Sequence, residues 1–423
     1  MTSTTLPRLL AGQHVPLTLS EHELTFPVTP RTGTLLSELE ASGLTGRGGA
    51  GFPTAQKVHL LKSHRGHHKV VVVNAMEGEP ASRKDVTLLR VNPHLVLDGA
   101  EALASLIGAN EIIICVAREK ESLARIVRDA LAERVRHHRR PVRSSVQTPP
   151  GRYVAGEETA LVNWLNNRET LPQYRAKRPH VARLHDRAVL VDNAETCAHV
   201  GFIARAGAQS FRSLGTVASP GTALVSISGA LDRPQVLEVV LGTPLRQILA
   251  VAGADPDPQA LLLGGYGGAW LDAAHLDTPY ANETLTPLGA STGAGVIVVL
   301  ARDGCAVSET ERVVRWMANE SARQCGPCAF GLPSLADDLA LLRQGASEAS
   351  LAVQRLTSRC AVIKGRGACH HPDGVVRFVR SALDVFRDDI ANHASGRPCV
   401  GSGSARHYAT VPHLDHEGEL TWQ

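Results

Sequence analysis

The spacing of apolar residues changes along this chain and divides it into three regions. Between residues 33 and 215, continuous apolar runs alternate with stretches whose apolar residues recur at helical spacing. The runs are Val70–Val73, Ile112–Val116 and Ala188–Val191, and helical stretches between them are Leu95–Ile107 and Leu123–Leu131. Buried strands separated by helices are typical of parallel sheets covered on both faces. This region is therefore predicted to be a Rossmann-like, three-layer α/β domain.

The pattern becomes shorter and more strand-like over residues 216–304, and then fully helical over residues 305–394. The first of these regions contains predicted strands at Ala223–Ser228, Gln235–Val240 and Val296–Leu300, one helix at Pro244–Ala250 and a glycine turn at Gly264–Gly268. A small mixed sheet over one helix indicates a β-grasp domain. Helical spacing at Val313–Met317, Leu335–Leu342, Leu351–Leu356 and Val375–Phe386 predicts a helical bundle. Residues 1–32 and 395–423 are predicted to be an extended N-terminal arm and a flexible tail.

Bulk composition narrows the class of protein. The chain has 423 residues, 43% of them hydrophobic and 20% charged, and its net charge is +3. A near-neutral surface does not favour nucleic acid, and the basic segment Arg134–Arg143 is interpreted as a solvated helix end. No apolar run is long enough to span a membrane, and no signal-peptide core is present. We therefore expect a cytoplasmic enzyme without direct membrane insertion.

A glycine-rich stretch, Gly43–Lys57, is the strongest candidate for a ligand site. Gly46, Gly48 and Gly49 leave backbone amides bare, and Arg47 and Lys57 add positive charge, so the expected ligand carries phosphate. The stretch contains G-x-G-x-x-G, but the residues before it predict a helix rather than a strand. A dinucleotide fingerprint of the usual kind is therefore not indicated.

Polar residues also follow two of the predicted strands directly. Asn74–Glu79 comes after the first strand and Asp192–Thr196 after the third. Ligands of parallel sheets gather at the carboxyl ends of strands, so these residues are expected near the glycine stretch. Polar groups there suit the edge of a planar ligand, and the hydroxyl of Thr196 suits a phosphate. The acidic pair Glu157 and Glu158 has a simpler interpretation as an ordinary first helical turn.

Four blocks in the same order resemble the NADH-binding flavoprotein (FMN and iron–sulfur) component of respiratory complex I. The same module occurs in diaphorase subunits of NAD-linked hydrogenases and formate dehydrogenases. The blocks are Gly43–Lys57, Val73–Pro80, Gly151–Leu161 and Val191–Thr196. The resemblance implies an FMN site formed by Gly46, Arg47, Gly48, Gly49, Lys57, Asn74, Glu77, Tyr153, Gly156, Glu157, Glu158, Asp192, Asn193 and Thr196. It implies an NADH site formed by Phe52, Glu79, Glu158 and Lys177, with no catalytic acid or base.

The chain departs from the family pattern at three positions near these sites. Met76 replaces an aspartate, and one lost hydrogen bond is worth roughly 1 kcal/mol, so flavin binding is expected to survive with a shifted redox potential. Leu60 and His180 replace aromatic residues. Stacking contributes roughly 0.5–1.5 kcal/mol, so NADH binding is expected to weaken about tenfold or more. NADH remains the expected donor, with NADPH or a protein carrier as the alternatives.

The late cysteines predict a metal centre. Cys325, Cys328 and Cys369 have the Cys-x-x-Cys plus distant cysteine arrangement that wraps a cubane cluster. The family motif has one more cysteine, at the position of Ala322. Three interpretations stay open: a 4Fe–4S cluster with Cys360 or His370 as substitute ligand, a three-cysteine cluster such as 3Fe–4S, and zinc or no metal. Cys115 is predicted to be strand core, and Cys197, Cys305 and Cys399 are unassigned.

The resemblance implies an NADH dehydrogenase (diaphorase) module. It would transfer hydride from NADH to FMN and pass single electrons through an iron–sulfur cluster to a ferredoxin or another iron–sulfur protein or subunit. One alternative is a degenerate member that binds flavin or a partner without oxidising NADH. Another is a diaphorase component of a formate dehydrogenase or hydrogenase. The expected location is cytoplasmic or, through partners, peripheral to the inner face of the membrane.

Overall fold

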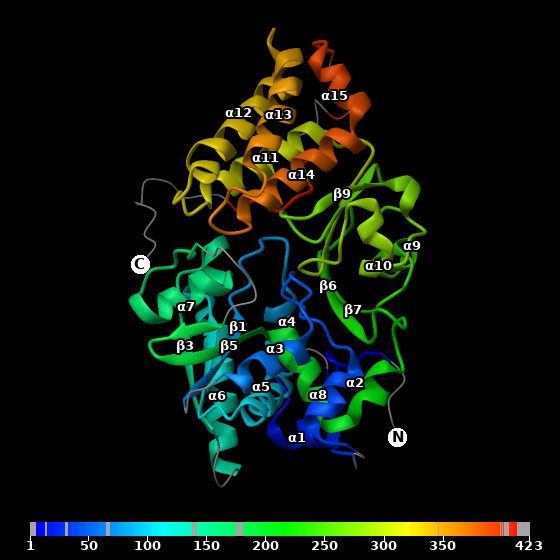
Figure 1. The fold of residues 1–423 in the computed structure, drawn as a ribbon. Helices are drawn as coiled ribbons and strands as arrows, with labels where there is room; N and C mark the ends of the chain where they lie inside the picture. The colour runs from blue at the N-terminus through cyan, green and yellow to red at the C-terminus, as the bar shows by residue number, and fades with distance from the viewer. Residues whose placement is uncertain are drawn as a thin grey trace.

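The computed structural model describes residues 6–12, 15–29, 33–64, 68–137, 142–174, 181–345, 347–397, 399, 401 and 406–412. Figure 1 shows an N-terminal α/β region, a second sheet beside it and a helical region above both. The predicted α/β fold class with a helical C-terminal region is confirmed. Within the described ranges, no helix is both long and apolar enough to cross a lipid bilayer.

The first sheet contains the three strands predicted from apolar runs. Its strand order is β3-β2-β1-β5-β4, with parallel pairing from β3 to β5 and antiparallel pairing of β4 with β5. The strands are β1 (Lys69–Ala75), β2 (Glu111–Val116), β3 (Arg143–Gln147), β4 (Ala182–Leu184) and β5 (Arg187–Asn193). The pattern did not predict the edge strands β3 and β4, because they are short and lack a continuous apolar run.

Helices cover both faces of this sheet, because successive strand residues point to opposite sides. Val71 and Val73 face a core shared with α5 and α8, whereas Val70 and Val72 face a core shared with α7. The helices of the region are α2 (Leu35–Ser42), α3 (Thr54–Ser63), α4 (Lys84–Val91), α5 (Pro93–Ile107), α6 (Glu121–His137), α7 (Glu158–Asn167) and α8 (Ala194–Arg212). The result is the predicted three-layer arrangement.

The N-terminal arm differs from the predicted extended segment. It contains helix α1 (Leu19–Thr25), which begins with a capping box in which Thr18 and Glu21 bind each other's backbone N–H groups. Leu9 and Phe26 are buried in the core of the first region. The arm is therefore part of this region, and the Thr18-x-x-Glu21 spacing is the sequence signal that indicates its helix.

The second sheet is mixed, as predicted for a β-grasp domain. Its order is β7-β6-β10-β8-β9, and only the β6–β10 pair is parallel among its described strands. The strands are β6 (Thr222–Gly229), β7 (Gln235–Val240), β8 (Ala260–Leu263), β9 (Ala269–Asp272) and β10 (Val296–Leu300), and the helices are α9 (Leu245–Ala252) and the short α10 (Asn282–Leu285). The predicted glycine turn connects β8 to β9, two strands that the sequence pattern did not predict.

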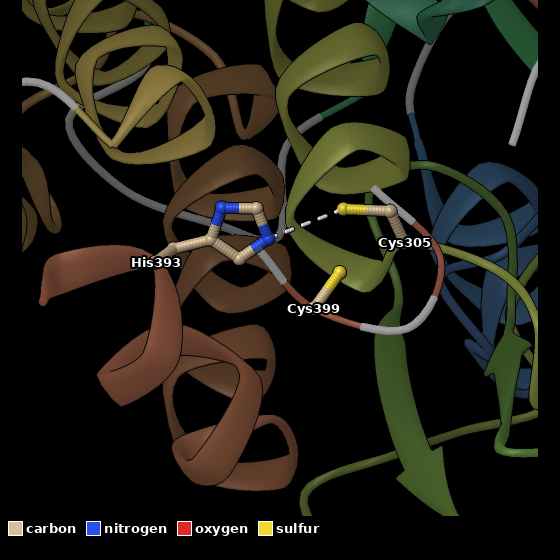
Figure 2. Close-up of side chains that lie close together, drawn as sticks. All are labelled: Cys305, His393 and Cys399. Atoms are coloured by element: carbon tan, nitrogen blue, oxygen red, sulfur yellow. Dashed lines mark hydrogen bonds between the residues drawn. The ribbon is translucent and has the colours of Figure 1, made fainter. Parts of the chain in front are cut away.

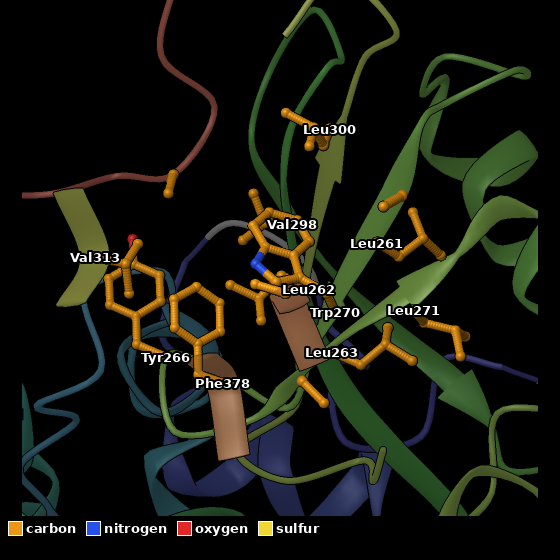
Figure 3. Packing of buried hydrophobic residues seen from close by; sticks show 14 of the residues in the cluster. Leu261, Leu262, Leu263, Tyr266, Trp270, Leu271, Val298, Leu300, Val313 and Phe378 are labelled. Atoms are coloured by element: carbon orange, nitrogen blue, oxygen red, sulfur yellow. The ribbon is translucent and has the colours of Figure 1, made fainter. Parts of the chain in front are cut away.

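The helical region shares one hydrophobic core with the second sheet (Figure 3). Trp270 of β9 packs against two phenylalanine rings of the bundle, with centroid separations of 5.7 Å to Phe378 and 5.2 Å to Phe386. Its indole N–H donates to Thr310 Oγ1 at 3.2 Å. The helices are α11 (Ala306–Asn319), α12 (Leu332–Gln344), α13 (Ala349–Ile363), α14 (His371–Val385) and α15 (Arg387–Ala394). The two regions that the pattern separates therefore pack together.

Part of the predicted flexible tail packs against the same regions. The backbone N–H of Ala409 donates to Glu309 Oε2 at 2.8 Å, and Tyr408 donates its hydroxyl to Asp303 Oδ1 at 2.6 Å. The hydroxyl of Tyr266 donates to the carbonyl of Thr410 at 2.5 Å. These contacts hold residues 406–412 in place, and residues 413–423 lie outside the described ranges.

Candidate functional site

The glycine stretch forms a closed loop between α2 and α3. The N–H of Gly46 donates to the carbonyl of Phe52 at 2.9 Å, which draws the two sides of the loop together. Gly49 has φ 105°, a conformation that favours glycine. A Cβ on Gly48 would lie 3.3 Å from Cβ of Asn193 at the end of β5. The bare loop backbone therefore lies directly against a strand end, as the sequence predicted.

Lys57 joins this loop to the end of β5 and the start of α7. Its ammonium donates to the carbonyl of Val191 and to Asp192 Oδ1, the latter at 3.3 Å, and lies 3.9 Å from Glu158 Oε2. Burial opposes the charge, but Asp192 and Glu158 outweigh burial and raise the pKa of Lys57. The second carboxylate oxygen of Asp192 is buried with no hydrogen-bond partner among the described residues. A polar group of a ligand could occupy this position.

Arg47 holds the loop to the second sheet as well as to α8. Its backbone N–H donates to Thr196 Oγ1 at 2.9 Å. Its guanidinium donates to Thr45 Oγ1 and to the carbonyl of Thr222, each at 3.2 Å. Burial lowers its pKa, although Glu195 opposes that shift. Arg47 Nε is buried with no hydrogen-bond partner among the described residues, and the predicted phosphate contact of Arg47 stays a prediction.

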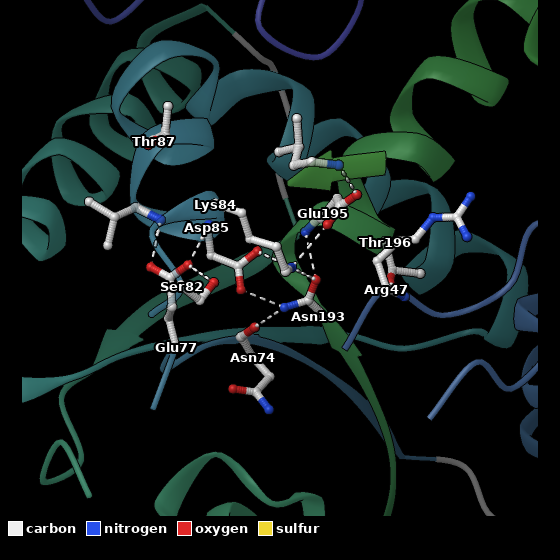
Figure 4. Close-up of polar contacts among 12 residues, drawn as sticks. Arg47, Asn74, Glu77, Ser82, Lys84, Asp85, Thr87, Asn193, Glu195 and Thr196 are labelled. Atoms are coloured by element: carbon white, nitrogen blue, oxygen red, sulfur yellow. Dashed lines mark hydrogen bonds and ion pairs between the residues drawn. The ribbon is translucent and has the colours of Figure 1, made fainter. Parts of the chain in front are cut away.

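A buried ionic network lies behind the loop (Figure 4). The ammonium of Lys84 contacts Asp85 Oδ1 at 2.9 Å, Asn193 Oδ1 at 3.0 Å and Glu195 Oε2 at 3.0 Å. The amide of Asn193 donates to Asp85 Oδ2 at 2.6 Å. These contacts fix the orientation of Asn193. Lys84, Asp85 and Glu195 were not among the predicted site residues, although the charged Arg83-Lys84-Asp85 triplet at the start of a helix was a usable signal.

Glu77 and Asn74 stabilise the turn that follows β1. Glu77 has φ 45°, and its carboxylate accepts hydrogen bonds from Ser82 Oγ at 2.8 Å and from the backbone N–H groups of Asp85 at 2.9 Å and Val86 at 3.1 Å. It therefore caps α4, and its predicted contact with the flavin edge stays a prediction. Asn74 Nδ2 donates to the carbonyl of Gly156 at 2.7 Å, which joins the end of β1 to the predicted Tyr153–Gly156 block.

The two neighbouring acidic residues Glu157 and Glu158 make different contacts. Glu157 is the N-cap of α7, and its carboxylate accepts from the N–H groups of Thr159 at 2.8 Å and Ala160 at 3.1 Å. The ordinary first-turn interpretation therefore describes Glu157. Glu158 instead faces Lys57 and keeps a side chain that is 32% exposed. It remains accessible to a ligand in the loop.

The described residues predicted to bind NADH differ in their exposure and contacts. Phe52 is 39% exposed, so its ring is accessible for stacking. Glu79 Oε2 accepts from the N–H of Tyr266 at 2.9 Å, and burial raises the pKa of Glu79 to about 7. Leu60 packs at the edge of the first core. Lys177 and His180 lie outside the described residues.

Three of the predicted metal ligands come together at one end of the bundle. Cys328 lies on a π-helical turn, Pro327–Gly331, that leads into α12, and Cys369 lies two residues before the start of α14. Burial raises the pKa of Cys328, and the neighbouring thiols of Cys325 and Cys369 raise it further. The thiols of Cys325 and Cys369 are thus close enough to Cys328 to influence its charge, which is compatible with a cluster held by three cysteines and with Ala322 as a non-ligand.

The two proposed substitute ligands lie in different settings. Cys360 is buried on α13, where burial raises its pKa to about 11 and Arg380 opposes that rise. It lines a cavity together with Thr357 and Leu383. His370 is next to Cys369, its side chain is 72% exposed, and it lies 3.7 Å from Asp373. His370 is thus adjacent in sequence to a clustered thiol, whereas Cys360 is on another helix.

Glu320, at the end of α11, joins the helical bundle to the turn at Arg152 and Tyr153 in the first region. Its carboxylate accepts hydrogen bonds from Arg152 Nε and from the N–H of Tyr153, both at 3.0 Å. The ring of Tyr153 packs against Trp316 and His371, each with a centroid separation of 5.4 Å. Burial raises the pKa of Cys369 to about 11, and the nearby charge of Glu157 adds to that rise. The Tyr153–Glu157 segment beside the glycine loop and the part of the bundle that carries Cys369 are therefore in contact.

Comparison with known proteins identifies an FMN-binding region and an iron–sulfur binding region in this chain. The Nuo51 FMN-binding domain model matches residues 39–201, and the NADH-ubiquinone oxidoreductase-F iron–sulfur binding region matches residues 308–393. The NADH-quinone oxidoreductase-F protein of Streptomyces coelicolor is 32% identical over 86% of this chain and 84% of its own. The corresponding Escherichia coli protein is 30% identical over 84% of this chain and 83% of its own.

A solved structure is also similar to this chain. The crystal structure of an NAD+-reducing [NiFe]-hydrogenase in the H2-reduced state superimposes with a TM-score of 0.78 and 27% identity. The match covers 85% of this chain and 62% of that chain, so this chain spans less than two thirds of the hydrogenase polypeptide. With the family models and the curated relatives, it shows that the chain belongs to the NADH-quinone oxidoreductase-F family, with an FMN-binding domain followed by an iron–sulfur binding region.

Proposed function

We propose that this chain is an NADH dehydrogenase (diaphorase) module that passes electrons from NADH to a partner protein. Bound FMN supplies the conversion of a two-electron hydride into single electrons, and an iron–sulfur cluster supplies the onward path. The observation that carries the proposal is the contact between the two sites. Glu320, in the cluster region, binds the Arg152–Tyr153 turn, whose neighbour Gly156 is bound by Asn74 at the end of β1.

The protein's contribution to flavin binding is a preformed cradle. The amides around Gly48 and the hydroxyl of Thr196 would bind phosphate, and Asn193 would face the ring system. The unpartnered Asp192 oxygen and the buried hydroxyl of Thr54, which has no partner among the described residues, are both consistent with a polar ligand at this place. Arg47 and Glu77 serve the cradle indirectly, because their side chains hold its walls. No side chain is assigned as an acid or base.

The nicotinamide substrate would bind at the rim of the same cradle. Phe52 offers an exposed ring for stacking, and Glu79 and Glu158 offer carboxylates for hydroxyl or amide groups. Lys177 completes the predicted set. NADH is the favoured donor, and NADPH or a protein carrier is the alternative.

For the metal centre we propose a cluster held by Cys325, Cys328 and Cys369. The fourth iron of a 4Fe–4S cluster would take a non-cysteine ligand at the side of His370, or would be absent, as in 3Fe–4S. His370 fits better than Cys360, because it is adjacent to Cys369 and exposed. Zinc in the same thiols is the remaining alternative.

The acceptor is proposed to be a ferredoxin or another iron–sulfur protein or subunit. The relatives, which are named as subunits of NADH-quinone oxidoreductase, suggest assembly with further subunits and peripheral association with a membrane. A diaphorase component of a hydrogenase is the second candidate, favoured by the structural likeness to the NAD+-reducing enzyme. Both candidates share the chemistry and differ in the partner.

The test is anaerobic reduction of the flavin-loaded protein by NADH. We expect the flavin absorbance to bleach, and we expect Phe52→Ala to raise the NADH concentration needed for half-bleaching while the bound flavin stays unchanged. NADPH serves as the matched donor control. A protein that retains stoichiometric flavin but is bleached by dithionite and by neither nucleotide would instead be the degenerate, non-oxidising member.

The metal proposal is tested separately on the same preparation. Iron and acid-labile sulfide are assayed, and the reduced and oxidised samples are examined by paramagnetic resonance. A 3Fe–4S centre gives its signal when oxidised and a 4Fe–4S centre when reduced. Absence of iron and sulfide from a fully folded, anaerobically isolated protein would overturn the cluster.

A further inference from the structure

Three metal-binding side chains meet at a place that the flavin and the cluster do not use. The ligand atoms of Cys305, His393 and Cys399 all lie within 4.8 Å of one another (Figure 2). Their residues are only 7%, 3% and 6% exposed. Cys305 Sγ lies 3.5 Å from His393 Nε2. Two thiols and an imidazole nitrogen thus point into one buried space.

The geometry corresponds to that of a tetrahedral zinc ion. Zn–S bonds of about 2.3 Å and Zn–N bonds of about 2.0–2.1 Å place a sulfur and a nitrogen ligand roughly 3.5 Å apart. The observed separation of Cys305 Sγ and His393 Nε2 is 3.5 Å. Thiolate and imidazole are also the ligands that select zinc over magnesium or calcium.

The three ligands come from three different segments. Cys305 is the N-cap of α11, His393 is in the last turn of α15, and Cys399 lies in the segment after α15. The backbone N–H of Ser308 donates to Cys305 Sγ at 3.4 Å. The Ser308 N–H favours the thiolate, but burial outweighs it and raises the pKa of Cys305 to about 12, so a metal ion would displace the proton of this thiol on binding.

The segment that carries Cys399 is packed closely against the segment that carries Cys305. A Cβ on Gly401 would lie 2.2 Å from the carbonyl carbon of Gly304 and 2.3 Å from the nitrogen of Cys305. Only glycine permits this approach. Further along, Ala409 binds Glu309 of α11. The position of Cys399 is therefore set by backbone packing independently of the thiol itself.

We propose that Cys305, His393 and Cys399 bind a zinc ion that fastens the C-terminal segment to the start of α11. Binding replaces one proton on each thiol by a bond to the ion, so two protons are released for each zinc bound. The described part of the chain supplies three ligands, and water would take the fourth position. The site is distinct from that of Cys325, Cys328 and Cys369, and its role is structural.

The test is the zinc content of the intact, cofactor-loaded chain, measured by elemental mass spectrometry. We expect about one zinc ion per chain in the parent protein and in the Cys325→Ser/Cys328→Ser variant. We expect its loss in Cys305→Ser and Cys399→Ser. Serine is itself a good N-cap, so the first substitution preserves the start of α11. Cys115→Ala is the matched control, because Cys115 is a buried strand thiol outside this group.

A second measurement covers the case in which the serine variants do not fold. The parent protein is stripped with a chelator and titrated with Co2+, and we expect thiolate charge-transfer bands together with tetrahedral d–d bands. Proteolysis after residue 394 is expected to accelerate on stripping and to slow again with zinc. Equal zinc in Cys305→Ser and the parent, absence of zinc and of cobalt bands, or a Cys305–Cys399 disulfide in anaerobic protein would each overturn the proposal.

Discussion

Replacing Lys84 with methionine tests the buried network behind the flavin cradle. The ammonium of Lys84 lies 2.9 Å from Asp85 Oδ1 and 3.0 Å from Glu195 Oε2, and its side chain is 3% exposed. At an effective dielectric constant of about 20, each contact is worth roughly 5–6 kcal/mol of Coulomb energy. Desolvation of a buried ammonium costs several kcal/mol. We expect Lys84→Met to lower the free energy of unfolding by about 3–5 kcal/mol at neutral pH, because two buried carboxylates lose their cation.

The stability difference between the parent and Lys84→Met is expected to depend on pH. In the parent, burial alone would raise the pKa of Glu195, but Lys84, His199 and Arg47 outweigh burial and lower it to about 2. The folded pKa is depressed, so the stabilisation is present above the ordinary value of 4.5 and is lost as the pH falls toward 2. Without Lys84 the folded pKa rises, and the carboxylate binds a proton more readily. The gap between parent and variant is therefore expected to narrow as the pH falls below about 5.

The assay is urea unfolding of parent and variant followed by circular dichroism, at neutral and mildly acidic pH, without added FMN. Ligand binding then adds nothing to the measured stability. Lys62→Met is the matched control, because it makes the same chemical change at an exposed position of α3. We also expect Lys84→Met to retain less flavin, because Asn193 loses a contact that orients it. A variant within about 1 kcal/mol of the parent at neutral pH, or a gap independent of pH, would refute the reasoning.

Three further predictions concern the same sites. Burial raises the pKa of Glu79 from 4.5 to about 7, so folding favours the protonated carboxyl group. In urea unfolding, the stability of the parent relative to Glu79→Gln is expected to fall by up to about 3 kcal/mol as the pH rises from 4.5 to 7. No change in this stability difference between pH 4.5 and 7 would exclude the pKa shift. Ala322→Cys restores the family's cysteine, and we expect more iron per chain and a 4Fe–4S signal; unchanged iron would show that position 322 does not reach the cluster. Gly48→Ala places a methyl group 3.3 Å from Cβ of Asn193, and we expect it to weaken FMN binding about tenfold in a fluorescence titration. In the control Gly46→Ala, the methyl group lies 3.5 Å from the carbonyl oxygen of Phe52, and we expect a smaller effect. Equal FMN affinities of the two variants would contradict the steric explanation.

The main architecture was readable from local patterns. Val70–Val73, Ile112–Val116 and Ala188–Val191 are strands because their continuous apolar character demands burial on both faces. Polar residues after these strands were expected at one edge, because parallel strands end together. Asn74 and Asn193 do lie there, paired directly with each other across β1 and β5. Where the pattern was short or polar, as in β3 and the arm helix α1, it did not predict the element.

The protein contacts of individual polar residues could not be read in this way. The sequence predicts Arg47 and Glu77 as ligand contacts, and this stays a prediction. It did not indicate that Arg47 also binds the second sheet or that Glu77 caps α4. A local pattern reports the chemistry of a side chain and the backbone near it. It does not report which distant donor or acceptor comes within hydrogen-bond distance, because that depends on how the elements pack.

The two groups of cysteines differ most clearly in how far the sequence alone predicts a shared metal site. Cys325 and Cys328 are three residues apart in sequence, so the short spacing alone predicts that their thiols can share a metal. Cys305 and His393 are 88 residues apart, and no local periodicity relates them. Backbone connectivity restricts near neighbours strongly and distant residues hardly at all. Only the packing of α11, α15 and the C-terminal segment brings this second group together.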